Sequence, residues 1–205
     1  MARVLLLAIL VAGCASISFA QSTDDYKKWE FYGGYSHNRV DTGSGNSIIS
    51  DREGFNGFDT AVTGNITRYV GLKVDFAGHF KSRTIPVGTT QINVDSSLYN
   101  LLGGVQIKDN STETRFKPFA QALVGVAHGR NKVDFGNTVC IAIFPSPCTN
   151  FTETDTGLGA AFGGGLDIRA GSRFDIRAIQ IDYNPTRLFD STQHNFRVGA
   201  GIVIH

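Results

Sequence analysis

Apolar and polar residues alternate with a period of two along much of this chain. From Phe58 to Ile66, and again from Val70 to Phe80, apolar side chains hold the even positions and polar or small side chains hold most of the odd ones. A period of two is that of a β-strand whose two faces meet different surroundings. The pattern therefore predicts an antiparallel hairpin whose strands are joined near Arg68 and Tyr69.

The same alternation recurs along the rest of the chain, and no segment after the N-terminal region carries a helical stripe. It is regular in Tyr99–Lys108, Gly157–Arg169 and Asn195–Ile204, and less regular in Trp29–Arg39, Arg115–His128 and Arg173–Tyr183. The sequence thus predicts an all-β fold of eight antiparallel strands.

Short and long connections alternate between the predicted strands. The short ones lie near Arg68–Tyr69, Asp109–Thr114 and Ala170–Ser172, and the long polar ones are Val40–Glu53, Lys81–Gln91, Gly129–Glu153 and Asn184–Gln193. An even strand number, with short turns at one end and long loops at the other, is typical of an up-and-down transmembrane β-barrel. We therefore expect the apolar faces to contact lipid and the polar faces to line a lumen.

The polar faces are rich in glycine, of which the chain has 24 in 205 residues. Glycine weakens an exposed strand, whereas inside a narrow eight-stranded barrel small residues leave room for opposite charges to pair. We expect a lumen charge network that plugs the barrel, with an ion path as the alternative. Its predicted members are Asp59, Lys73, Asp75, Asp167, Arg169 and Arg197. Aromatic residues near strand ends, Tyr32 and Phe119 among them, are expected in interfacial girdles.

The overall charge argues against a nucleic-acid partner. Lys and Arg number 19 and Asp and Glu number 18, so the formal net charge is +1. Nucleic-acid-binding proteins carry a strongly basic surface, which this balance does not supply. No pattern in the sequence predicts a cofactor, a metal site or a catalytic site.

The N-terminal region predicts export. Arg3 precedes an apolar segment from Val4 to Ala12, and Ser18-Phe19-Ala20 fits a signal-peptidase site. We predict a signal peptide over residues 1–20 and a barrel domain over residues 21–205. An alternative is that Val11-Ala12-Gly13-Cys14, which resembles a lipobox, makes Cys14 a lipidated N-terminus.

Two further cysteines, Cys140 and Cys148, lie close together in a segment that contains Pro145 and Pro147. In an oxidising compartment such a pair can close a small loop, so we predict a disulfide between them. A metal site is the alternative, although no histidine or second cysteine pair stands nearby with ligand spacing.

Several segments together resemble the bacterial outer-membrane β-barrel family related to the transmembrane domain of OmpA and to OmpX-like small barrels. The segments are Trp29–Ser36, Gly64–Leu72, Phe116–Phe119, Gly163–Asp167 and Ile176–Tyr183. The resemblance covers the chain from about Trp29 onward. It implies an eight-stranded barrel surrounded by the lipids of the bacterial outer membrane, with both termini in the periplasm.

The last predicted strand resembles the C-terminal assembly signal of such barrels at Arg197, Gly199, Ile202 and Ile204. The family usually ends on an aromatic residue, whereas His205 follows Ile204 here. The resemblance implies that barrel-assembly machinery and periplasmic chaperones are partners during biogenesis.

The expected function is structural or interactive and non-enzymatic, with the surface loops, above all 129–153, meeting an extracellular partner. The alternatives are a small pore, a lipid A-modifying barrel enzyme and a soluble periplasmic ligand-binding barrel. An enzyme would need a nucleophile, a base and an orienting carboxylate close together. The candidate groups are His79, His128 and His194, with Ser82, Asp134, Asp190 and Ser191 near them in sequence.

Overall fold

The computed structural model describes residues 26–41, 52–87, 90–135 and 151–205. Its strands are β1 (Trp29–Asp41), β2 (Arg52–Asn65), β3 (Val70–Val87), β4 (Thr90–Lys108), β5 (Phe116–Phe135), β6 (Phe151–Arg169), β7 (Phe174–Leu188) and β8 (Ser191–Ile204). The predicted signal peptide with Cys14, and the predicted disulfide between Cys140 and Cys148, lie outside the described residues and stay predictions.

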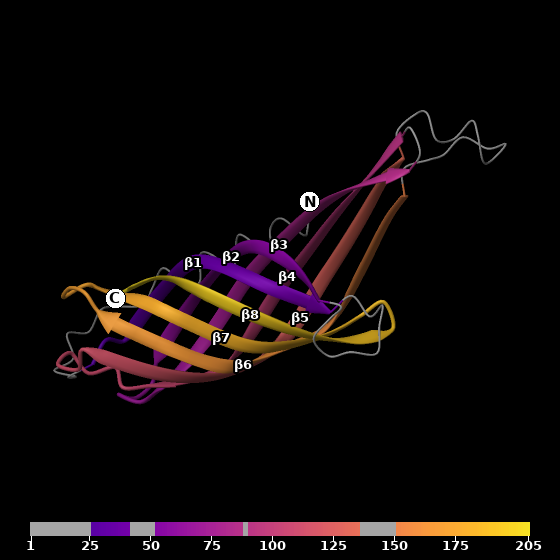
Figure 1. Cartoon of the computed structure of the whole chain (residues 1–205). Coiled ribbons are helices and arrows are strands. Elements are labelled where there is room, and N and C mark those ends of the chain that lie inside the picture. The colour runs from indigo at the N-terminus through magenta and orange to yellow at the C-terminus, as the bar shows by residue number, and fades with distance from the viewer. Residues whose placement is uncertain (1–25, 42–51, 88–89, 136–150) are drawn as a thin grey trace, which may run out of the picture.

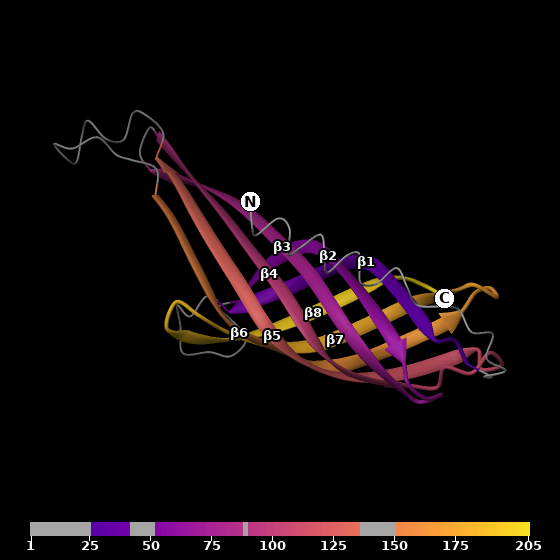
Figure 2. The same cartoon turned by 180° about the vertical axis from the view of Figure 1, so that it is seen from behind.

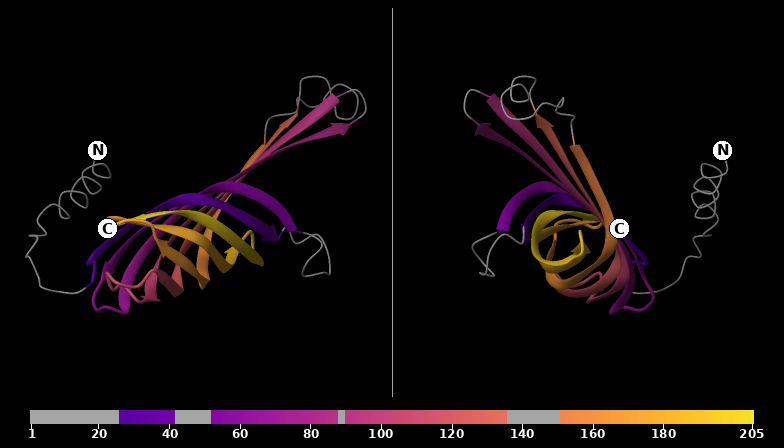
Figure 3. Two further views of the ribbon diagram at one scale, coloured as in Figure 1. Left: turned by 60° about the vertical axis from the view of Figure 1, so that its left-hand side comes forward. Right: turned by 90° about the vertical axis from the view of Figure 1, so that its right-hand side faces the viewer.

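The strands form a closed antiparallel barrel in which each strand pairs with the next along the chain. The ring closes between the first and last strands, where Phe31 faces Ile204 and Arg39 faces Phe196. The end-on view in Figure 3 shows the closed ring. The predicted all-β, eight-stranded, up-and-down architecture is confirmed. No helix in the described residues is long and apolar enough to cross a membrane.

The barrel is apolar outside and polar inside. Along β3, Leu72 and Val74 are 55% and 56% exposed, whereas Lys73 and Asp75, which alternate with them, are 1% and 0% exposed. A soluble barrel has the opposite arrangement, with its apolar face in the core. A continuous apolar outer band with polar residues inside is the pattern of a barrel that faces lipid.

The two ends of the barrel differ. At the short-turn end, turns join β2 to β3, β4 to β5 and β6 to β7, and the backbone of His205 bonds that of Arg173. At the other end β3, β4, β5 and β6 continue beyond the remaining strands (Figures 1 and 2). We call this extension, residues 81–87, 90–97, 130–135 and 151–155, the projecting sheet.

The structure corrects three of the predicted long loops. The described residues of Lys81–Gln91 and of Gly129–Glu153 (129–135 and 151–153) are paired strand, with Thr84 opposite Asn93 and Lys132 opposite Thr152. Asn184–Gln193 is a strand end with a tight turn, in which Phe189 and Asp190 have positive φ angles. These segments were predicted as loops because polar residues and prolines, Pro86 and Pro185 among them, interrupt the alternation that marks a lipid-facing strand.

Outward-facing rings cluster below the projecting sheet. Phe58 and Phe76 are 5.7 Å apart between ring centroids, and Phe80 and Tyr99 are 5.5 Å apart. Such clusters are typical of the interfacial girdle of a membrane barrel. Two residues expected in a girdle, Tyr32 and Phe119, instead lie inside the barrel, where each is only 6% exposed.

A charge placed on the outer face tests whether that face meets hydrocarbon. Replacing Val74 by Arg is expected to lower the free energy of unfolding in phospholipid vesicles by about 2–4 kcal/mol, because a cation near the bilayer midplane is desolvated. Urea titration measures this change. Val74→Leu, the matched control, is expected to change the stability little, and equal stability of the two variants would contradict a lipid-facing position.

Candidate functional site

The centre of the lumen holds an ion-pair cluster around the guanidinium of Arg197 on β8. Its Nη1 lies 2.9 Å from Oδ1 of Asp75, and its Nη2 lies 2.8 Å from Oδ2 of Asp182. Asp59 adds a third carboxylate, with 3.5 Å between Arg197 Nη1 and Asp59 Oδ2. All four side chains are buried. One cation thereby ties together strands β2, β3, β7 and β8.

Lys73 and two glutamines extend this cluster across the lumen. The Lys73 ammonium lies 3.7 Å from Asp75 and donates a 2.7 Å hydrogen bond to Gln121. Gln121 in turn donates to Asp182, and Gln180 donates to both Asp182 and Asp59. Buried charges are tolerated when they are paired and hydrogen-bonded in this way. The network therefore connects side chains of β2, β3, β5, β7 and β8 across the lumen.

A second cluster lies nearer the short-turn end. Lys108 lies 2.6 Å from Glu30 and 3.1 Å from Asp167, and Arg177 donates two bonds to Asp167, at 2.8 and 3.1 Å. The guanidinium of Arg177 is held between two rings, 4.3 Å from the centroid of Tyr32 and 4.1 Å from that of Phe119. Cation–π contacts of this kind strengthen when water is excluded.

Glycines make room for these two rings. A Cβ at Gly201 would lie 2.9 Å from the Tyr32 ring, and one at Gly165 would lie 2.8 Å from the Phe119 ring. Both distances are shorter than real carbon contacts allow. Part of the glycine excess therefore serves to admit the aromatic clamp on Arg177.

A β-bulge in β7 sends two polar side chains into the lumen three residues apart. The register with β8 shifts between Arg177 and Gln180, so both are buried while Ala178 and Ile179 between them face outward. Arg177 Nη1 donates a 2.8 Å bond to Gln180. Bulges commonly re-aim a side chain in this way.

An apolar layer spans the lumen below the projecting sheet. It consists of Val40, Phe55, Leu98, Ala127 and Leu188, contributed by five strands, with Phe189 packed against them. This layer lies between the polar part of the lumen and the projecting sheet. It also covers Ser36 and His79, whose Oγ and Nε2 atoms lie 2.9 Å apart in the lumen.

The histidines considered for catalysis do not come together. His79 is buried in the lumen beside Ser36, whereas His128 is exposed and bonds Thr156 at 2.7 Å. His194 is also exposed, and its Nδ1 lies 2.5 Å from the Tyr183 hydroxyl. The described residues therefore place no accessible triad around these three rings.

The predicted charge network is divided by the structure. Asp59, Lys73, Asp75 and Arg197 lie in the central cluster, and Asp167 lies in the second one. Arg169 belongs to neither cluster, because it lies at the short-turn end and donates to the carbonyl of Thr112. Of the predicted assembly signal, Arg197 and Gly199 face inward, while Ile202 and Ile204 are exposed on the outer face.

Several lumen residues were not predicted. They are Glu30, Lys108, Lys117, Gln121, Asp175, Arg177, Gln180 and Asp182. Most come from the strands with mixed faces. For β7 a signal was present: adjacent apolar residues at 178 and 179, flanked by polar ones at 177 and 180, mark the break in phase that a bulge produces.

An ion pair joins two of the short turns. Arg68 Nε, between β2 and β3, lies 2.9 Å from Oδ1 of Asp109, between β4 and β5. The hydrogen bond from Arg68 lowers the pKa of Asp109 to about 2. The carboxylate thus stays charged throughout the physiological range and keeps the two turns together.

The projecting sheet has two edges without a paired neighbour in the described residues. β2 pairs with β3 only as far as Asn56 opposite Phe80, so β3 beyond Phe80 has a free edge. β7 pairs with β6 from Gly159 opposite Thr186, and the Phe189 N–H donates to the Asp155 carboxylate, so β6 from Phe151 to Thr154 has the other. A free strand edge presents unpaired N–H and C=O groups to any chain that approaches it.

The chain matches a known protein family and is similar in structure to several solved proteins. The family model described as outer membrane protein beta-barrel domain matches residues 5–202. One similar solved structure is that of Ail, the attachment invasion locus protein of Yersinia pestis, in complex with the heparin analogue sucrose octasulfate. Its sequence is 20% identical, the match covers 85% of this chain and 97% of that chain, and the TM-score is 0.58. Neisserial surface protein A is 14% identical, with coverages of 87% and 97% and a TM-score of 0.50. No curated protein sequence matches the chain.

The central cluster predicts a large cost for removing its cation. Replacing Arg197 by Met leaves three buried carboxylates short of a partner, and we expect a loss of about 3–5 kcal/mol of unfolding free energy in lipid vesicles. The matched control is Arg39→Met, at an exposed position of β1, for which we expect a change within about 0.5 kcal/mol. Equal urea midpoints for both variants would show that the cluster does not hold the barrel together.

Proposed function

The chain belongs to the outer membrane protein beta-barrel domain family, and on that basis we propose that it is a non-enzymatic surface-recognition protein of the bacterial outer membrane. The observation that supports this proposal is the projecting sheet, which raises four strands beyond the barrel on the side opposite the short turns (Figure 1). Short turns face the periplasm in bacterial barrels, so the projecting sheet faces the cell exterior.

The barrel gives the projecting sheet a rigid base. Its four strands run without interruption from the short-turn end into the exterior, and their pairing continues to Val87 opposite Thr90 and to Val133 opposite Phe151. Below them the lumen is filled by buried ion pairs. Recognition segments are commonly held by a rigid scaffold, because binding to a preformed surface costs less conformational entropy.

The two free edges differ in how well they could accept a partner strand. On β3 the edge carries Lys81, Arg83 and Pro86, and lysine and proline are the usual means of keeping an edge strand from pairing. On β6 the edge from Phe151 to Thr154 contains neither lysine nor proline. We therefore assign strand addition by an extended segment of a partner protein to this edge of β6, which overlaps the region 129–153 expected from the sequence.

Catalysis and conduction have less support. The Ser36–His79 pair lies under the apolar layer of Val40, Phe55, Leu98, Ala127 and Leu188, so a substrate from the exterior would have to cross that layer. The lumen side chains are paired with one another, and an eight-stranded barrel leaves space for little besides its own side chains. The side chains of the lumen therefore serve to hold the projecting sheet in place rather than to catalyse a reaction or conduct ions.

Trimming one hairpin of the projecting sheet tests the proposal. Gly129 faces Asp155 across β5 and β6, so replacing residues 130–154 by Asn-Gly keeps all pairs below and removes the free edge of β6. We expect cells that carry the full-length protein to adhere to a surface coated with plasma proteins, matrix proteins or heparin. We expect cells that carry the trimmed protein to adhere no better than cells without it.

Heparin is included because Ail is known in complex with a heparin analogue. The matched control trims the other hairpin, with Asn-Gly in place of residues 85–92 and Thr84 still opposite Asn93. This control should retain adhesion, because the β6 edge remains. Both proteins must show the heat-modifiable migration of a folded barrel. Adhesion that survives the 130–154 trim but not the 85–92 trim would reject the assignment to β6.

The filled lumen also predicts the electrical behaviour of the protein. In planar bilayers we expect no stable open current from the folded full-length chain, because ion pairs and an apolar layer occupy the interior. A porin in the same bilayers serves as the positive control. A reproducible unitary conductance that requires the folded protein would support the small-pore alternative instead.

A further inference from the structure

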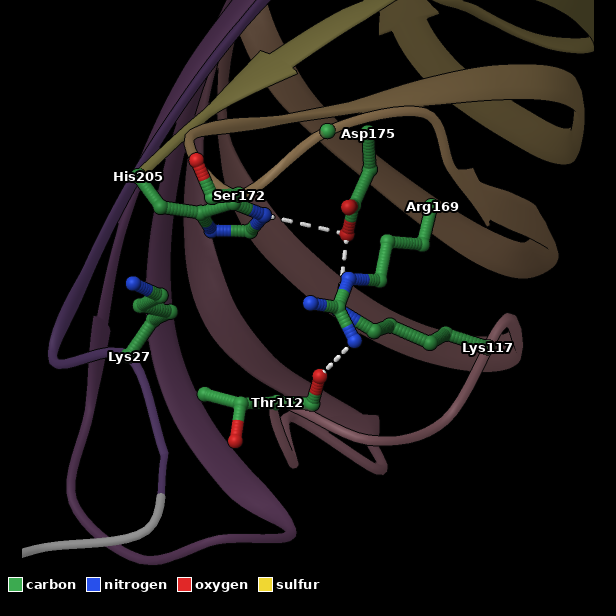
Figure 4. A pocket seen from close by; sticks show the side chains of 8 residues that line it. Lys27, Thr112, Lys117, Arg169, Ser172, Asp175 and His205 are labelled. Carbon is green, nitrogen blue, oxygen red and sulfur yellow. Dashed lines mark hydrogen bonds and ion pairs between the residues drawn. The ribbon is translucent and has the colours of Figure 1, made fainter.

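The mouth of the lumen at the short-turn end contains a cavity surrounded by positive charge (Figure 4). Its volume is about 240 Å³. Lys27 comes from the segment before β1, Lys117 from β5 and Arg169 from the end of β6, and His205 follows β8. Three cationic side chains and one imidazole, from different parts of the chain, thus line this cavity.

The only carboxylate among the lining residues, Asp175, does not balance these charges. Its Oδ2 lies 2.9 Å from the Lys117 ammonium and 3.0 Å from His205 Nε2. The side chains of Lys27, Lys117 and Arg169 exceed the single acidic side chain by two charges. Positive charges gathered at low exposure repel one another, and a bound anion removes that repulsion.

Hydrogen-bond donors around the cavity remain unused among the described residues. Lys117 spends one of its three N–H groups on Asp175, and Arg169 donates from Nη1 to the Thr112 carbonyl. Nδ1 of His205 is also buried without a hydrogen-bond partner, and because Nε2 faces the Asp175 carboxylate, Nδ1 of the neutral ring is an acceptor. A buried polar atom without a partner calls for a ligand or a water molecule.

We propose that this mouth binds a phosphate dianion from the periplasm, either free phosphate or the terminal phosphate of a monoester. Its double negative charge matches the surplus of two positive side-chain charges, and its oxygens accept bonds from ammonium and guanidinium donors. Ser172, whose side chain also lines the cavity, adds a hydroxyl donor. A carboxylate carries a single charge and leaves one positive charge unbalanced.

The position of the cavity identifies where the ligand comes from. Lys117 and Asp175 face the lumen, whereas their neighbours Phe116 and Phe174 face outward and are 56% and 43% exposed. Bilayer lipids contact the outward face, so their headgroups lie on the other side of the strands. The ligand therefore reaches the mouth from the aqueous periplasm.

The test uses the folded full-length chain in lipid nanodiscs at about pH 8, where phosphate is a dianion. Inorganic phosphate is titrated while the ring resonance of His205 and the heat of binding are recorded. We expect a saturable shift of that resonance. We expect Lys27→Gln and Arg169→Gln each to weaken binding roughly tenfold, as the loss of one charge beside a dianion would.

The matched control is Lys28→Gln, which removes the same charge from the neighbouring residue outside the cavity lining. Binding should be unchanged in this variant. A loss equal to that of Lys27→Gln would mean that general electrostatic attraction, not a site, holds the anion, and would overturn the proposal. Absence of a saturable His205 shift in the unmodified protein would overturn it as well.

Two further probes define the ligand. Phenyl phosphate tests the monoester: binding as tight as that of inorganic phosphate assigns the site to a phosphorylated molecule, and exclusion of the phenyl group assigns it to free phosphate. Acetate tests the charge requirement and should bind more weakly than phosphate. Equal binding of acetate and phosphate would contradict a site built for a dianion.

Discussion

Hydrocarbon offers no hydrogen-bond partner to a peptide group, and this constraint governs the whole molecule. Every backbone N–H and C=O within the membrane must pair with another strand, so the sheet closes on itself, with Phe31 of β1 opposite Ile204 of β8. Closure with eight strands leaves a narrow interior. The polar faces of all the strands turn into that space, and their charges have to be neutralised within it.

The charges in the lumen are neutralised in successive layers of side chains along the barrel axis. Nearest the periplasm is the cationic mouth, and beyond it lie the Lys108–Asp167–Arg177 cluster and the Arg197 cluster. The apolar layer closes the interior toward the cell exterior. Because the interior is occupied in this way, we place the recognition role in the part of the protein that leaves the membrane, where the strands continue as the projecting sheet.

Alternation in the sequence was enough to predict the fold, because a lipid-facing strand must keep its apolar side chains in one phase. Strand ends were harder to predict: in Lys81–Val87 both faces meet water, so no apolar period separates strand from loop. The site was predicted in part. Asp59, Lys73, Asp75 and Arg197 stood out as charges among glycines, but pairing depends on which strands face each other across the lumen. Sequence spacing does not contain that information, and the bulge that brings Arg177 and Gln180 inward changed the phase of β7.

The position of Arg197 has a consequence for the order in which the barrel is assembled. Arg197 lies on the last strand to leave the ribosome, and its partners Asp59 and Asp75 lie on β2 and β3. Until β8 joins β1, these carboxylates lack their guanidinium, and an open intermediate carries uncompensated negative charge. The β1–β8 seam extends only from Phe31 to Arg39, whereas β3 and β4 pair from Val70 to Val87. Neutralisation of Asp59 and Asp75 by Arg197 thus depends on the closing of a short seam, so the same event that completes the ring also completes the charge balance of the interior.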